Sequence, residues 1–91
     1  MEIEVYDTYA TSEKGIKIHF DVMLPVGGNL ENASSYAQDF IKKITVSSES
    51  VKLDSCKFCH TEEAKTNVSE KVEKDGFCIV PIKNCPNPYS L

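Results

Sequence analysis

The sequence contains no arginine and no tryptophan, and its 10 basic residues are all lysines. Without arginine, the chain lacks the forked guanidinium donor that reads guanine bases and binds phosphates in bidentate fashion. With 14 acidic residues, its formal net charge is −4 at pH 7, so it also lacks the positive surface that attracts nucleic acid. We therefore expect no nucleic-acid partner.

Long hydrophobic runs are also missing. The longest apolar stretches, residues 22–26 and 79–82, are each interrupted by a proline, whereas a membrane-spanning helix needs about 20 apolar residues. The N-terminal segment Met-Glu-Ile-Glu-Val starts acidic and alternates at once, unlike a signal peptide. We expect no membrane association, and a cytoplasmic protein with reduced thiols.

The length of the chain limits it to one small core. With 91 residues, 41% of them hydrophobic, we expect a single α+β domain over residues 1–85 and an irregular, proline-containing tail over residues 86–91. The net stability of so small a domain is about 5–10 kcal/mol. A bound metal ion or a partner would therefore contribute a large share of it.

Alternation of apolar and polar residues predicts the strands. It extends over residues 2–9 and 16–24, which predicts an N-terminal β-hairpin with one apolar face. A short third strand is expected over residues 51–53. Residues 77–82 read as a last strand, and Pro81 near its end indicates a strand at the edge of the sheet.

Apolar residues at helical spacing predict two helices. The first runs over residues 30–44, with Asn29 as its N-cap, and packs on the apolar face of the hairpin. A smaller number of apolar residues at helical spacing predicts a second helix over residues 67–75, which ends before Gly76. The expected fold is α+β in the order ββαβαβ, with a small mixed sheet and two helices in a single layer pair.

Four cysteines in so short a chain are its unusual feature. Cys56, Cys59 and His60 form a Cys-x-x-Cys-His motif, which we expect in a turn. Two thiols at this spacing in a turn can bind one tetrahedral Zn²⁺ ion, but a closed site needs two further nitrogen or sulfur ligands. The chain offers four candidates for these two positions: His60, His19, Cys78 and Cys85.

His19 is the more informative of the two histidines. It is expected on the polar face of the hairpin, with Asp21 two residues further along the same face. The expected register places Tyr6 opposite His19 and Glu4 opposite Asp21. Such a group suits a general base, a histidine ligand supported by carboxylates, or an ordinary solvated face. Asp7 is expected to point inward and to cap the following turn.

Three functions remain open for the Cys-x-x-Cys-His motif. The first is a structural or regulatory zinc site formed by Cys56, Cys59, His60 and His19, with Cys85 as a possible addition. The second is thiol-disulfide chemistry between Cys56 and Cys59. The third is a homodimeric interaction module that uses the edge strand or the uncovered hairpin face. No haem is expected, because attachment at this motif requires export, and no enzymatic reaction is indicated.

These motifs together resemble a family of small bacterial proteins, domain of unknown function 2024. The resemblance extends from Glu2 to Cys85 and implies a compact α+β fold without an established activity. It also implies that Cys78 lies outside the shared pattern. The motifs that carry the resemblance are Asp7-Thr8-Tyr9, Gly15, His19-Phe20-Asp21, Cys56-x-Phe58-Cys59-His60 with Glu63, Gly76-Phe77 and Cys85.

Overall fold

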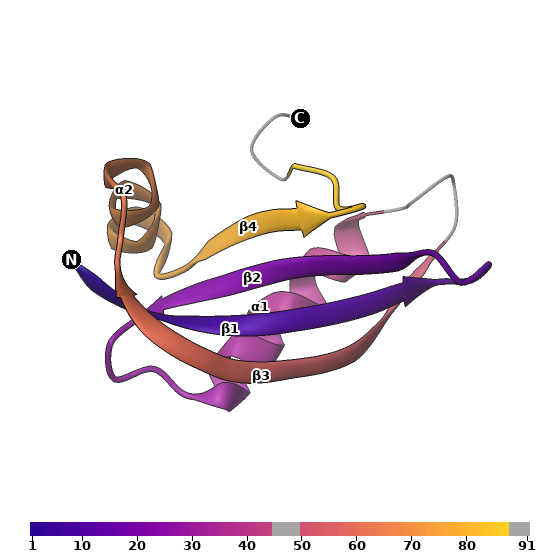
Figure 1. The fold of residues 1–91 in the computed structure, drawn as a ribbon, viewed down its shortest axis with the longest axis horizontal. Coiled ribbons are helices and arrows are strands. Elements are labelled where there is room, and N and C mark those ends of the chain that lie inside the picture. The colour runs from indigo at the N-terminus through magenta and orange to yellow at the C-terminus, as the bar shows by residue number, and fades with distance from the viewer. Residues whose placement is uncertain (45–49, 88–91) are drawn as a thin grey trace.

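The computed structural model describes residues 1–44 and 50–87, so residues 88–91 of the expected tail lie outside the described part (Figure 1). The α+β fold and the order ββαβαβ are confirmed. Within the described residues, no helix is long and apolar enough to cross a bilayer. The elements are β1 (Glu2–Ser12), β2 (Lys17–Pro25), α1 (Leu30–Lys43), β3 (Val51–Glu63), α2 (Thr66–Asp75) and β4 (Cys78–Lys83).

The four strands form one sheet in the order β3-β1-β2-β4. Each neighbouring pair is antiparallel, so the sheet is purely antiparallel, and the expectation of a mixed sheet is wrong. The expected edge position of the last strand is confirmed, because β4 pairs with β2 at one side of the sheet. At the other side, β3 pairs with β1 and forms the second edge.

Helix α1 covers one face of the sheet, as predicted (Figure 1). Asn29 caps it, and its side-chain Oδ1 accepts a hydrogen bond of 2.8 Å from the backbone N–H of Asn32. Phe40 of α1 meets the fully buried Phe20 of β2 edge to face, with ring centroids 5.0 Å apart. This core fixes β2 so that its remaining side chains point to the opposite face.

Helix α2 covers only one end of that opposite face (Figure 1). Val72 packs there with Ile3, Val5 and Met23, which forms a second, smaller core. Gly76 ends α2 in the left-handed conformation, with φ of 84°, as the sequence predicted. Along the rest of this face, β1 and β2 carry polar side chains without a covering helix.

The register of the hairpin differs from the expected one. Tyr9 lies opposite His19, and Asp7 lies opposite Asp21, so Tyr6 is not the partner of His19. The expected register is wrong because β1 continues to Ser12, three residues beyond its expected end at residue 9. Since strand residues alternate between faces, Asp7 points to the face opposite α1 rather than into the core.

Strand β3 is much longer than the expected three residues. It pairs with β1 along its whole length, and it contains Cys56, Cys59 and His60, which the sequence placed in a turn. Register shifts opposite Val5/Tyr6 and opposite Tyr9/Ala10 indicate β-bulges in this pairing. The expected turn is wrong because backbone pairing with the edge of β1 extends the motif as a strand.

Candidate metal centre

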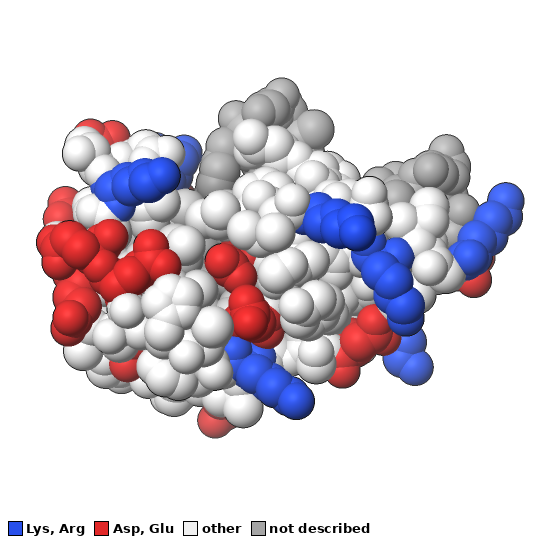
Figure 2. Space-filling view, in the orientation of Figure 1, with Lys and Arg blue, Asp and Glu red and all other residues white. Residues whose placement is uncertain are grey.

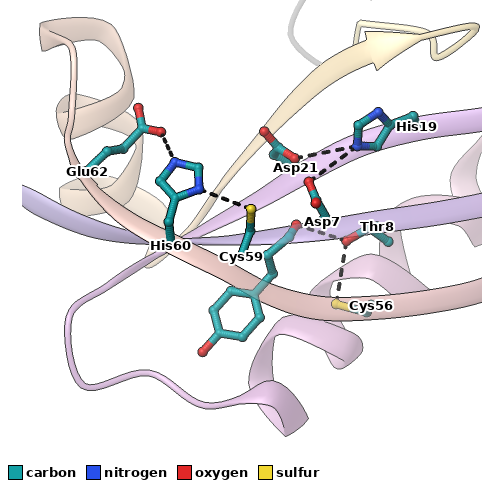
Figure 3. Close-up of polar contacts among 9 residues, drawn as sticks. Asp7, Thr8, His19, Asp21, Cys56, Cys59, His60 and Glu62 are labelled. Atoms are coloured by element: carbon teal, nitrogen blue, oxygen red, sulfur yellow. Dashed lines mark hydrogen bonds and ion pairs between the residues drawn. The ribbon is translucent and has the colours of Figure 1, made fainter.

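Asp7, His19 and Asp21 form a cluster on the sheet face opposite α1 (Figure 3). Asp7 comes from β1, and His19 and Asp21 come from β2, two residues apart on the same face. Nε2 of His19 lies 3.4 Å from Oδ1 of Asp7 and 3.9 Å from Oδ1 of Asp21. One ligand atom from each residue lies within 4.8 Å of the other two.

The carboxyl group of Asp21 is the buried member of this cluster. Only 16% of its side chain is exposed, and no described residue makes a hydrogen bond to its buried Oδ1 atom. Burial, a hydrogen bond with Asp7 and the negative charge of Asp7 together raise the pKa of Asp21 to about 6. Burial of a carboxylate oxygen without a hydrogen-bond partner is costly unless a proton or a cation lies beside it.

Asp7 is more exposed, and its pKa changes in the opposite direction. Burial opposes the change, but hydrogen bonds from Asp21, His19 and Cys59 outweigh it and hold the pKa of Asp7 below its ordinary value. The opposite shifts make Asp21 the carboxyl group that binds a proton first as the pH falls, while Asp7 stays ionised to lower pH. This pair presents a single negative charge when the proton is bound.

Tyr9 fixes the imidazole ring of His19. The two residues are cross-strand partners, and their rings stack with centroids 4.3 Å apart and an interplanar angle of 8°. Stacking holds the ring plane so that Nε2 points to the two aspartates. From the sequence, Tyr9 belongs to the motif Asp7-Thr8-Tyr9 but is not a predicted site residue, because its role follows from the register, which only the structure reveals.

The cluster offers two carboxylate oxygens and one imidazole nitrogen, a set that zinc and neighbouring transition metals bind. Two ligand atoms bound at about 2.1 Å to one tetrahedral ion lie roughly 3.4 Å apart. The Nε2–Oδ1 distances of 3.4 and 3.9 Å are close to this separation. A single ion would also neutralise the two facing carboxylates and coordinate the unpartnered Oδ1 atom of Asp21.

Strand β3 brings two further predicted residues, Cys59 and His60, to the same face (Figure 3). The Cys59 thiol interacts with the carboxyl group of Asp7. The Cys59 sulfur also lies 3.1 Å from Nδ1 of His60. Desolvation and the charge of Asp7 raise the pKa of the Cys59 thiol. Nε2 of His60 lies 2.7 Å from Oε1 of Glu62, a residue that the sequence analysis did not single out.

Three other predicted residues lie on the α1 side of the sheet. The sulfur of Cys56 accepts a hydrogen bond of 3.5 Å from Thr8 and packs against the main core. Tyr6 is buried in that core. Cys85 is half-buried against the same core, and this burial raises the pKa of its thiol to about 11. The structure therefore separates Cys56 from Cys59, and Tyr6 from His19.

The spatial separation of Cys56 and Cys59 follows from the strand geometry. Successive side chains of a strand alternate between faces, so thiols three positions apart lie on opposite sides unless the backbone changes. Cys56 is paired with Thr8, whose side chain points toward α1. All four cysteines of the chain are free thiols.

Acidic and lysine side chains both lie on the face that the cluster occupies. Figure 2 shows acidic side chains over the middle of the sheet and, more densely, at the end near the N-terminus and α2, with lysine side chains beside them.

Comparisons with known proteins cover the whole of this site. The family described as "Domain of unknown function (DUF2024)" matches residues 1–82. The NMR structure of protein NE1680 from Nitrosomonas europaea, a structural genomics target, is similar over 94% of this chain and 100% of that chain, with 31% sequence identity and a TM-score of 0.76. No curated protein matches the chain.

Proposed function

The chain belongs to the family of domains of unknown function DUF2024, and we propose that it binds one divalent transition-metal ion, Zn²⁺ foremost, through Asp7, His19 and Asp21. The observation that carries the proposal is the buried Oδ1 atom of Asp21. It has no hydrogen-bond partner among the described residues, and it faces a second carboxylate and an imidazole nitrogen.

Of the zinc ligands expected from the sequence, this proposal keeps His19 and replaces Cys56, Cys59 and His60 with two aspartates. A site formed by Cys56 and Cys59 together would require one thiol to cross to the other face of β3. The role of the ion is structural or regulatory, because it would join β1 to β2 at the point where two carboxylates face each other.

Zinc titration of untagged, chelator-treated protein tests the proposal. We expect one ion per chain, measured by calorimetry and by elemental analysis after gel filtration. Asp7→Asn, His19→Gln and Asp21→Asn should each lower the affinity by more than the roughly 100-fold that loss of an outer-shell partner can cost. Each variant is checked for folding by circular dichroism in the absence of metal.

Cys56→Ser is the matched control for this experiment, because Cys56 lies on the α1 side of the sheet. We expect it to bind zinc as the unchanged protein does. Loss of binding in Cys56→Ser, with binding retained in the aspartate variants, would contradict the proposal and favour the Cys-x-x-Cys-His site. Failure of the unchanged protein to bind any divalent transition metal would overturn both.

A second candidate function is a homodimeric interaction module, which uses β4. The observation that favours it is the position of β4 at the edge of the sheet, where Ile82 is 52% exposed. Sedimentation velocity over a range of protein concentrations tests it. A dimer that Ile82→Lys dissociates would support this function, and a monomer at high concentration would contradict it.

A further inference from the structure

We propose that Cys59 is a fourth ligand of this metal centre, positioned by His60 and Glu62, and that it makes the centre selective for thiophilic ions. This inference rests on the proposed function, because Cys59 alone forms no site. It assigns separate roles to the two cysteines of the motif: Cys59 serves the metal centre, and Cys56 packs in the core.

A β-bulge explains how His60 comes to lie on the same face as Cys59 and the cluster. In a regular strand, Cys59 and His60 would point to opposite faces. Here His60 pairs with Val5 and Phe58 pairs with Tyr6, so Cys59 is the extra residue between two paired positions. The bulge turns both side chains so that the Cys59 sulfur lies 3.1 Å from Nδ1 of His60 (Figure 3).

Glu62 determines which nitrogen of His60 carries the proton. Its Oε1 atom lies 2.7 Å from Nε2, which is therefore the donor in the neutral imidazole. Nδ1 is then the acceptor, and it points to the thiol of Cys59. A carboxylate that orients a histidine in this way is a common outer-shell feature of metal sites.

The Cys59 side chain interacts with one member of the cluster, the carboxyl group of Asp7. Its sulfur lies outside the group of ligand atoms within 4.8 Å of one another, so it would move toward a bound ion. When a metal ion binds, the S–H bond breaks and an S–metal bond of about 2.3 Å forms. The proton passes to Nδ1 of His60, and Glu62 stabilises the resulting imidazolium. The ion then has two oxygen ligands, one nitrogen and one sulfur, which completes a tetrahedral set.

Sulfur ligation changes which ions the centre prefers. Carboxylate oxygens alone also suit Mg²⁺ and Mn²⁺, whereas a thiolate favours Zn²⁺, Co²⁺ and the softer ion Cd²⁺. Without Cys59, the remaining two aspartates and His19 would discriminate less between these two groups of ions. We therefore expect Cys59→Ser to lower the affinity for Zn²⁺ more than the affinity for Mn²⁺.

Binding of Co²⁺ to the metal-free full chain tests the inference, because thiolate ligation produces a near-ultraviolet charge-transfer band. We expect this band in the unchanged protein and in the matched control Cys56→Ser. Cys59→Ser should bind Co²⁺ more weakly and without the band. Glu62→Gln should retain the band at saturation but lower the affinity roughly 10–100-fold, as expected for a residue that orients His60.

The possible results separate this inference from the proposed function. Co²⁺ binding without a thiolate band in the unchanged protein would overturn the role of Cys59 and leave the Asp7, His19 and Asp21 site intact. A band that persists in Cys59→Ser and disappears in Cys56→Ser would also overturn it. Absence of Co²⁺ and Zn²⁺ binding in the unchanged protein would overturn the proposed function itself.

Discussion

Asp7 and Asp21 are direct cross-strand partners in the β-hairpin, and their side chains lie on the same face of the sheet. Like charges in this position destabilise a strand pair. Below about pH 6, the raised pKa of Asp21 reduces this cost, because Asp21 then binds a proton and only Asp7 is charged. A divalent cation would remove the repulsion more completely, since it can bind both carboxylates in their ionised form.

The first prediction concerns the pH dependence of the metal-free protein. The pKa of Asp21 is about 6, above its ordinary value of 3.8, so its contribution to stability is present at low pH and is lost as the pH rises through 6. Asp7 contributes in the opposite direction, because its pKa is lowered: its contribution is lost as the pH falls below its ordinary value of 3.8. Between about pH 4 and pH 7, Asp21 should therefore dominate.

Thermal unfolding in the presence of a chelator measures this effect. The charged groups that face Asp21 are Asp7, His19 and His60. Asp21→Asn should be more stable than the unchanged protein at pH 7, by on the order of 2 kcal/mol, and the difference should vanish near pH 4. The control Asp39→Asn changes the same charge at an exposed position of α1 and should show no such trend. A constant difference across this pH range would contradict the prediction.

The second prediction concerns the stack of Tyr9 on His19. Tyr9→Ala removes the ring that holds the imidazole, so the Zn²⁺ affinity should fall roughly 10–100-fold, as for other outer-shell residues of metal sites. Tyr9→Phe keeps the ring and should bind as the unchanged protein does. Calorimetric titration measures the affinity. Equal affinities for the Ala and Phe variants would show that the stack does not position His19.

The sequence predicts the hairpin and α1 well, because their apolar residues are regularly spaced and form one buried face on each element. Residues 18, 20, 22 and 24 of β2 are all buried against α1, and the stripe of residues 33, 37, 40 and 41 meets them. Burial of side chains produces the periodicity from which these elements are predicted. The end of α2 at Gly76 is predicted for a different reason, since a positive φ favours glycine.

The register and β3 could not be predicted in the same way. In β1, the buried face includes Thr8 and Ser12, which are polar, so the alternation does not reveal which face is the core. From Lys57 to Glu63, the β3 side chains are exposed, and the strand depends on backbone pairing with β1. The site depends on both features. The sequence therefore predicts that His19 and Asp21 share a face, but it does not predict that Asp7 lies beside them.

The third prediction tests the cap of α1, on which the main core depends. Asn29→Ala removes the acceptor for the N–H of Asn32 and should lower the free energy of unfolding by about 1 kcal/mol. Asn29→Asp and Asn29→Ser retain a capping oxygen and should lie within a few tenths of a kcal/mol of the unchanged protein. Urea denaturation at constant pH measures all four proteins. A uniform loss in the three variants would assign the effect to something other than the cap.

The fourth prediction concerns oxidation of the two cysteines in the motif. Cys56 packs on the α1 side of β3 and Cys59 lies on the other side, so an intramolecular bond requires β3 to separate from β1. Diamide treatment of the folded protein should therefore yield no bond between Cys56 and Cys59, as judged by peptide mass mapping, while the same treatment in denaturant should yield one. Cys59→Ser should remove the bond formed in denaturant. Rapid formation of the Cys56–Cys59 bond in the folded protein would support a thiol-disulfide function instead.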